Sequence, residues 1–389
     1  MAIRSWIAGY ANNGKAQRYG DVEVMISGNY CLIIDGGCEQ ATDKLIAYLK
    51  RNKIKKVYLL LTHAHYDHFY GLKKIIEDDY FEVQAFYCYN PKTLEVGLSN
   101  NRGSREVRSD IEALKNIINK CKNKKIAVKY LKHKQKVALG DIKFQVFRKQ
   151  PTHVEDDDTE GWSYVNDGSL CLYFYELYYW TSGDGSERIY DFIKELGIKV
   201  KFFKIPHHGN NCPMSQAEGL KEQGANVCWY NSLEPNGVGT TDFTEYGARR
   251  CKQAGINVLT VDGDINWIAR NGKLIVYKGN KKISFVVKYM GSDVFKSPTV
   301  NVIRNIFLGK YKSSEDRYTR LLDAGYYPLA AQNKVDKVIS VAKQIISGKL
   351  DYGRDKQRII NLDKQFGKGY GQLIQDEINS LLGAKSKKW

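Results

Sequence analysis

The chain has 389 residues, of which 43% are hydrophobic, so it is long enough for two folded domains, and its composition excludes a wholly disordered protein. Its formal charge of +17 indicates a basic surface that either meets a polyanion or only maintains solubility. No stretch approaches the roughly 18 consecutive apolar residues that span a bilayer, and residues 1–7 lack the apolar core of a signal peptide. We therefore expect no membrane span, and synthesis in the cytoplasm without a signal peptide.

Strand-like and helix-like segments alternate along residues 1–289, which predicts an α/β domain. The first series comprises strands over residues 17–25 and 30–34, a helix over 42–52, a strand over 57–61 and a helix over 71–78. The second comprises strands over 142–147 and 169–175, a helix over 188–196 and a strand over 200–205. The domain ends with strands over 256–261, 267–269, 274–277 and 283–289. Asn271-Gly272 is typical of a hairpin turn between two of them.

Residues 290–299 form a short linker, and beyond it the pattern becomes helical and repeats. Ile303-x-x-Ile306 followed by Gly309 returns as Ala342-x-x-Ile345 followed by Gly348. This self-similarity predicts a small all-α domain built from two repeats, residues 300–340 and 341–389.

Histidines and acidic residues follow the predicted strands at three places. The candidate ligands are His63, His65, Asp67, His68, Asp184 and one histidine of the pair His207-His208. Imidazole and carboxylate suit Zn²⁺, with Mn²⁺ as the alternative, and one short loop cannot surround an ion, so the remaining ligands must come from elsewhere in the chain. The spacing therefore predicts a metal site on loops at one edge of the sheets.

These clusters and Asp35-Gly36 follow the order of the motifs of the metallo-β-lactamase superfamily, which residues 1–289 resemble. The resemblance implies an αββα sandwich, two stacked sheets with helices outside. It also implies two ions with a metal-bound hydroxide as nucleophile. His63, His65 and His153 would hold one ion, while Asp67, His68 and one histidine of the 207–208 pair would hold the other, with Asp184 between them.

The remaining site residues have roles that the sequence only partly decides. Adjacent residues of an extended segment point opposite ways, so we expect His208 to bind the ion and His207 to face the substrate, although the reverse stays open. Asp67, His207 and Asp184 are the expected catalytic residues. Asp35 is expected to orient a ligating histidine, and Asn166 and Ser169 to support the site from outside the ligands.

The double-histidine-glycine motif, together with residues 166–170, resembles the branch of competence-channel nucleases and teichoic-acid phosphorylcholine esterases. Gly309-Lys310-Tyr311 and Ala324-Gly325-Tyr326 resemble the CW-seven repeats that bind peptidoglycan. These resemblances imply a di-zinc phosphodiesterase of phage or bacterial origin that acts on cell-wall or teichoic-acid phosphodiesters. Residues 300–389 would hold it at the wall after release at lysis.

Two other functions stay open. A competence-type metal-dependent nuclease would use the basic surface to bind DNA. A non-enzymatic adaptor would use only the helical repeats. If the substrate carries choline, five aromatic residues are candidates for a cage around its quaternary ammonium group: Trp162, Tyr164, Tyr178, Tyr179 and Trp180.

Overall fold

The computed structural model divides into two compact units, Met1–Asp293 and Val294–Trp389. It describes residues 3–8, 20–149, 151, 162–185, 189–195, 197–209, 214–230, 246–260, 264–278, 281–287, 298–311, 317, 320–321, 326 and 328–383. Within these ranges, no helix has both the length and the apolar composition that a bilayer crossing requires.

The first sheet of the first unit has the strand order β16-β15-β14-β1-β2-β3-β4-β5-β6. Its strands are β1 (Ile3–Ile7), β2 (Glu23–Ser27), β3 (Tyr30–Ile34), β4 (Lys56–Leu60), β5 (Glu82–Cys88), β6 (Ala127–Tyr130), β14 (Ile265–Arg270), β15 (Lys273–Lys278) and β16 (Lys281–Val286). Strands β3 to β6 run parallel, and the other neighbouring pairs are antiparallel.

The second sheet has the order β13-β12-β11-β10-β9-β8-β7. Its strands are β7 (Lys136–Leu139), β8 (Ile142–Phe147), β9 (Cys171–Phe174), β10 (Tyr179–Thr181), β11 (Phe202–Lys204), β12 (Val227–Tyr230) and β13 (Asn257–Thr260). Strands β10 to β13 run parallel. In both sheets the parallel strands lead into the loops that carry the candidate ligands.

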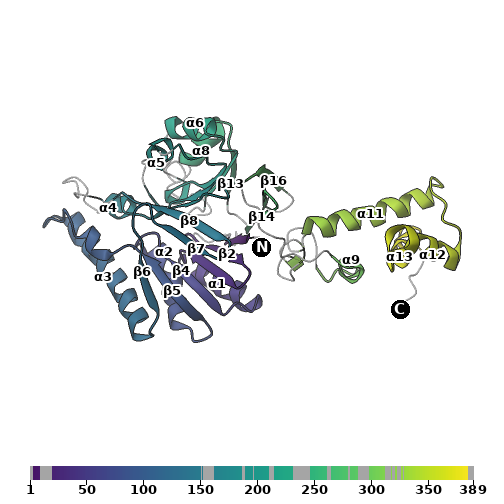
Figure 1. Ribbon diagram of the computed structural model, residues 1–389, viewed down its shortest axis with the longest axis horizontal. Coiled ribbons are helices and arrows are strands. Elements are labelled where there is room, and N and C mark those ends of the chain that lie inside the picture. Colours follow the sequence, from purple (N-terminus) through teal and green to yellow (C-terminus); the bar gives the residue numbers. More distant parts are fainter. Residues whose placement is uncertain are drawn as a thin grey trace. The chain divides into compact units, whose positions relative to one another are not determined.

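Helices cover the outer face of each sheet (Figure 1). The helices on the first sheet are α1 (Glu39–Arg51), α2 (Tyr66–Glu77) and α3 (Arg102–Asn123), and those on the second are α5 (Ile189–Glu195), α6 (Met214–Glu222) and α8 (Tyr246–Gln253). Leu172 and Phe174 of β9 pack in the core that includes the first sheet, whereas Cys171 and Tyr173 pack with α5, α6 and α8. This alternation follows from the two-residue period of a strand that is buried on both faces. The expected αββα sandwich is therefore confirmed.

Two differences between the expected and the observed element limits affect the candidate site. The hairpin of β2 and β3 is present, but β2 covers residues 23–27 rather than 17–25. Helix α2 begins at Tyr66 rather than at residue 71, so Asp67 and His68 lie in its first turn. The N-cap residue is His65, which makes no side-chain capping hydrogen bond. Because this position lacks the Ser, Thr or Asp that usually marks a helix start, the sequence did not indicate where α2 begins. At Asn271 and Gly272 the positive φ angles of 45° and 69° form the predicted turn between β14 and β15.

The described part of the second unit is helical, as expected, and packs around one apolar core. Its helices are α9 (Val300–Phe307), α11 (Pro328–Ile346), α12 (Asp355–Phe366) and α13 (Tyr370–Leu381). Gly309 and Gly348 follow α9 and α11 with φ angles of 70° and 72°, a backbone conformation that ends helices and favours glycine. The expected border between the repeats at residues 340–341 lies inside α11, because neither Gly nor Pro interrupts residues 331–346.

Candidate metal centre

The candidate site lies where strands of both sheets end. Asp35 follows β3, and the segment from Thr62 to His68 follows β4, which is parallel to β3. Asp184 and His208 follow the parallel strands β10 and β11. Parallel strands bring their carboxyl ends to one edge of a sheet, where ligands of α/β proteins bind. The topology therefore gathers residues that are far apart in the sequence.

One half of the site consists of His63, His65 and Asp184, whose donor atoms lie within 4.8 Å of one another. Nε2 of His63 is 3.1 Å from Nδ1 of His65 and 3.8 Å from Oδ2 of Asp184. We call this group the His63 half. Two imidazoles and a carboxylate that face one point are donors suited to Zn²⁺.

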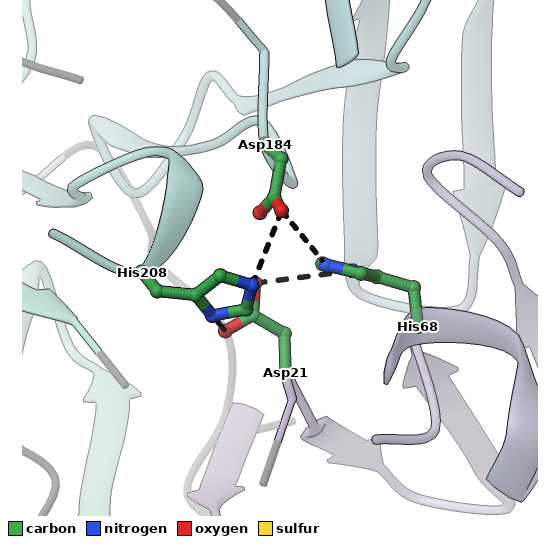
Figure 2. A group of neighbouring side chains, drawn as sticks. All are labelled: Asp21, His68, Asp184 and His208. Atoms are coloured by element: carbon green, nitrogen blue, oxygen red, sulfur yellow. Dashed lines mark ion pairs between the residues drawn. The ribbon is translucent and has the colours of Figure 1, made fainter. Parts of the chain in front are cut away.

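The other half, the His208 half, includes His68, His208 and the same Asp184 (Figure 2). Nε2 of His68 and Nε2 of His208 lie 3.3 Å and 3.1 Å from Oδ2 of Asp184. Oδ2 of Asp67 is 2.9 Å from Nε2 of His208 and 3.8 Å from Nε2 of His68. The structure thus brings six of the expected ligands together, and Oδ2 of Asp184 faces both halves.

Asp21 also lies within 4.8 Å of the donors of the His208 half, although the sequence did not indicate it. Its carboxylate faces the other side of the rings: Oδ1 is 3.7 Å from Nδ1 of His208, and Oδ2 is 3.9 Å from Nδ1 of His68. Asp21 precedes β2, which is antiparallel to β3, so the register of Glu23 with Ile34 brings Asp21 to the edge where β3 ends. The pairing of β2 with β3 is therefore the feature that would have identified Asp21 as a site residue.

Each of the four imidazoles has an oxygen atom beside the ring nitrogen that points away from the centre. The pairs are His63 Nδ1 with Thr62 Oγ1 at 3.1 Å, His65 Nε2 with Asp110 Oδ2 at 3.6 Å, His68 Nδ1 with Asp35 Oδ2 at 2.8 Å, and His208 Nδ1 with Asp21 Oδ1 at 3.7 Å. The pairs at His63 and His68 are within hydrogen-bond distance, and metal-binding histidines usually have such partners, which fix the ring and its tautomer. Asp35 lies where it was expected to orient a histidine, and the donor set fits divalent ions.

Charge differs between the two halves. Burial, and then the neighbouring imidazoles, hold the pKa of His63 well below its ordinary value, and burial lowers the pKa of His65 to about 4. In the His208 half burial acts in the same direction, but Asp184 and the other carboxylates outweigh it. They raise the pKa of His208 to about 10 and that of His68 well above its ordinary value. Those imidazoles therefore hold protons where a cation would sit.

The turn at Pro206–Gly209 separates the two adjacent histidines. His207 and His208 both have left-handed backbone, with φ angles of 49° and 53°, where an extended segment was expected. Consecutive left-handed residues other than glycine are strained, and such strain is concentrated at functional sites. The turn buries His208 among the carboxylates and leaves His207 half-buried, and both histidines line the adjoining cavity.

Close backbone contact fixes the loops around the site. A Cβ atom at Gly71 would lie 2.1 Å from the carbonyl oxygen of Gly36, so only glycine fits there. The amide of Gly36 donates to the carbonyl of His68 at 2.7 Å, and the amide of Asp21 donates to that of Asp67 at 3.2 Å. These contacts lock the loop after β3 and the segment before β2 against the start of α2.

A cavity of about 350 Å³ opens beside the centre. Its lining residues are His65, Tyr66, Asp67, Glu106, Ser109, Asp110, Asn166, Asp184, His207 and His208. Asn166 is 4% exposed, and its Oδ1 has no hydrogen-bond partner among the described residues. Ser169 is buried behind it and does not line the cavity. Residue His153 lies outside the described residues.

Three of the five candidate cage residues are buried and cannot surround a ligand, while the side chain of Trp162 lies outside the described part of the chain. Tyr179 and Trp180 have no exposed surface, and Tyr164 is 4% exposed. Tyr179 and Trp180, adjacent in β10, face opposite sides of the sheet and pack in different cores. Their alternation along a doubly buried strand explains the aromatic run without a ligand.

Comparisons with known proteins give one family match and several similar folds. The model of the metallo-beta-lactamase superfamily matches residues 20–80. Among solved structures, the metallo-beta-lactamase fold protein YhfI from Bacillus subtilis is 13% identical, with a TM-score of 0.43 over 69% of this chain and 100% of that one. No curated protein matches the chain at a significant level.

Two further solved structures are similar. A putative metallo-beta-lactamase from Thermotoga maritima is 15% identical, with a TM-score of 0.33 over 52% of this chain and 95% of that one. A CmlA beta-hydroxylase variant is 13% identical, with a TM-score of 0.41 over 68% of this chain and 53% of that one. The family match covers β2 to α2, which carry His63, His65, Asp67 and His68. The match to the metallo-beta-lactamase superfamily model therefore includes four of the six candidate ligands.

Proposed function

We propose that this chain is a hydrolase that uses two Zn²⁺ ions, or Mn²⁺ in their place, to cleave phosphodiesters of the cell wall or of teichoic acid. The position of Asp184 carries the proposal. Its Oδ2 atom lies within 3.8 Å of a ring nitrogen from each half of the site. A carboxylate shared between two sets of ligands is suited to a two-ion hydrolytic centre.

The residues divide into two sets of ligands. In this proposal His63, His65 and Asp184 hold one ion, and Asp67, His68, His208 and Asp184 hold the other. When bound, the ions lower the pKa of a water molecule and polarise the phosphoryl group. Within the part of the chain that the structure describes, three side chains would hold the ion of the His63 half, and His153, the further ligand expected from the sequence, lies outside that part.

Two residues of the cavity are placed to bind the substrate. Burial lowers the pKa of His207, so its imidazole is neutral at pH 7 and can donate a hydrogen bond to the phosphate or the leaving group. The side-chain amide of Asn166 borders the same cavity and can donate a second one. In the proposed reaction both orient the phosphodiester beside Asp184.

The wall formed by α3 favours a substrate with a cationic group near its phosphate. Glu106 and Asp110 of this helix line the cavity. These two acids give the wall its negative charge. Burial is the main cause that raises the pKa of Asp110 to about 7, and the charges of Glu106 and Asp67 add to it. A cationic group would relieve the repulsion, and a second phosphate would increase it. The wall therefore supports a phosphorylcholine-like ester over a DNA backbone.

A panel of substrates tests this proposal. The purified, zinc-loaded chain should hydrolyse bis-p-nitrophenyl phosphate and p-nitrophenylphosphorylcholine and leave nitrocefin intact. Turnover of nitrocefin alone would refute a phosphodiesterase. Cleavage of single-stranded DNA that falls steeply with salt, without turnover of the choline ester, would favour the nuclease instead. Chelator-treated protein is the matched control.

For the second unit we propose attachment to the bacterial cell wall. The unit repeats one arrangement: Nη1 of Arg317 donates to Gln332 at 3.1 Å, and Nη1 of Arg358 donates to Gln375 at 3.3 Å. Two copies of one binding site would raise affinity for a repeating polymer through effective concentration. The whole chain should sediment with insoluble walls, and a chain ending at residue 293 should not. Equal sedimentation of both would refute the attachment.

A further inference from the structure

Lys204, the last residue of β11, is buried beside the metal centre. Its side chain is 1% exposed, and it is the only lysine with a buried side chain in the part of the chain that the structure describes. A buried ammonium group is costly unless opposite charges and hydrogen-bond acceptors surround it. The groups around the ammonium group of Lys204 must therefore offset the cost of burying its charge.

Three acceptors from two separate segments surround the ammonium group. Nζ of Lys204 is 2.5 Å from Oδ2 of Asp21, 2.6 Å from the carbonyl oxygen of Gly183 and 3.6 Å from Oδ1 of Asp184. The ammonium group donates a hydrogen bond to the carbonyl oxygen of Gly183, and its contacts with Asp21 and Asp184 are ion pairs. Lys204 does not line the cavity, so its ammonium group faces other protein groups rather than a substrate.

The contact with Asp184 separates the two oxygens of that carboxylate. Oδ1 faces Lys204, whereas Oδ2 faces the inner nitrogens of His63, His68 and His208. The two oxygens of an ionised carboxylate are equivalent, so a half-turn would leave this arrangement unchanged. A smaller rotation would move one oxygen away from Lys204 and the other out of line with the histidines, and the attraction of the ammonium group opposes it.

The contact with Asp21 acts on the histidines from behind. The carboxylate of Asp21 lies on the outer side of the His208 and His68 rings, and Lys204 holds it from the opposite direction. Lys204 thus contacts both Asp21, which lies beside the Nδ1 atoms of the two rings, and Asp184, which lies beside their Nε2 atoms. Both contacts bear on the His208 half.

We propose that Lys204 is a positioning residue that arranges Asp184 and Asp21 so that the His208 half is assembled for its metal ion. This inference rests on the proposed metal centre and is independent of the substrate. A lysine that only balanced charge would have the opposite effect on affinity, because its positive charge repels a cation. Removing it would then strengthen binding, whereas removing a positioning lysine weakens it.

The test compares metal binding by the full-length chain and by Lys204→Met, which keeps the length of the side chain without its charge. Co²⁺ affinity is measured by competition with a chromophoric chelator, and the visible spectrum of bound Co²⁺ reports the ligand geometry. We expect affinity about ten- to a hundredfold lower and an altered spectrum, as for other residues that orient metal ligands. Lys201→Met, in the segment that leads into β11, is the matched control and should bind as the wild type does.

A second variant covers the case in which Lys204→Met fails to fold, which circular dichroism would reveal. Asp21→Asn keeps the shape of the side chain but removes the charge that Lys204 binds, and it should weaken Co²⁺ binding in the same range. Wild-type or tighter affinity in the folded variants would overturn the positioning role alone. A wild-type chain without metal affinity would overturn the proposed metal centre as well. A chain that binds Co²⁺ but cleaves no phosphodiester would refute the proposed function and leave this inference standing.

Discussion

The two halves of the candidate metal centre share Asp184 but differ in charge. Burial dominates in the His63 half, and the pKa values of His63 and His65 are lowered. In the His208 half carboxylates outweigh burial, and the pKa values of His68 and His208 are raised. The number of nearby carboxylates therefore decides whether a buried histidine is protonated. An ion must displace protons from the His208 half, whereas the His63 half is ready to bind.

The largest effect should come from the residue that both halves share. Asp184→Ala removes the oxygen that faces His63, His68 and His208, so we expect loss of both ions and a fall in bis-p-nitrophenyl phosphate turnover of more than about a hundredfold. Metal content by mass spectrometry and steady-state kinetics check this. Full occupancy by two ions in the folded variant would exclude Asp184 as a shared ligand.

The pH dependence of metal binding should separate the halves. The pKa values of His68 and His208 are both raised, that of His208 to about 10, so both imidazoles are protonated at neutral pH and an ion bound there releases two protons. Affinity should therefore rise by about a hundredfold per pH unit between pH 6 and 8. With lowered pKa values, His63 and His65 have no protons to lose, so affinity in their half should change little above pH 7.

Zinc titrations of His63→Ala and His68→Ala measure these slopes, because each variant leaves one half intact. Equal slopes in the two variants would contradict the difference in protonation.

Adjacent histidines should give different defects. His208→Ala removes a proposed ligand, so the His208 half should lose its ion and turnover should fall by about a hundredfold. His207→Ala should keep both ions and lose about tenfold in turnover, because a hydrogen bond to the substrate is lost. Metal content and kinetics together distinguish the two roles. The reverse pattern would assign the ligand to His207.

The smallest effect should come from the acidic wall. Asp110→Asn removes negative charge but keeps a side chain of the same size beside His65. We expect the KM for p-nitrophenylphosphorylcholine to rise by about fivefold, while turnover of bis-p-nitrophenyl phosphate changes by less than about threefold. An equal loss with both substrates would mean that Asp110 acts by orienting His65 rather than through its charge.

The sequence was informative wherever ligands follow buried strands. The apolar run before His63 and the run before His207 predict strands, and parallel strand ends converge, so their meeting with Asp184 follows from the fold class. Asp35 could be placed for the same reason, because it directly follows β3.

Residues whose position depends on register or on a helix face could not be predicted. Asp21 precedes a strand whose expected limits were wrong, and Asp110 lies in the middle of α3, where nothing local distinguishes it from a surface acid. Lys204 sits at the end of a strand that the pattern placed correctly, yet a terminal lysine is usually exposed. The left-handed turn at His207 and His208 is imposed by tertiary packing and has no local signal of its own.

Anomalous diffraction from crystals of the zinc-loaded chain would test the shared centre most directly. We expect two zinc peaks on the order of 3.5–4 Å apart, one beside His63 and His65 and the other beside His68 and His208, with Asp184 contacting both. Peaks outside this cluster, or a single ion that Asp184 does not contact, would contradict the two-ion site.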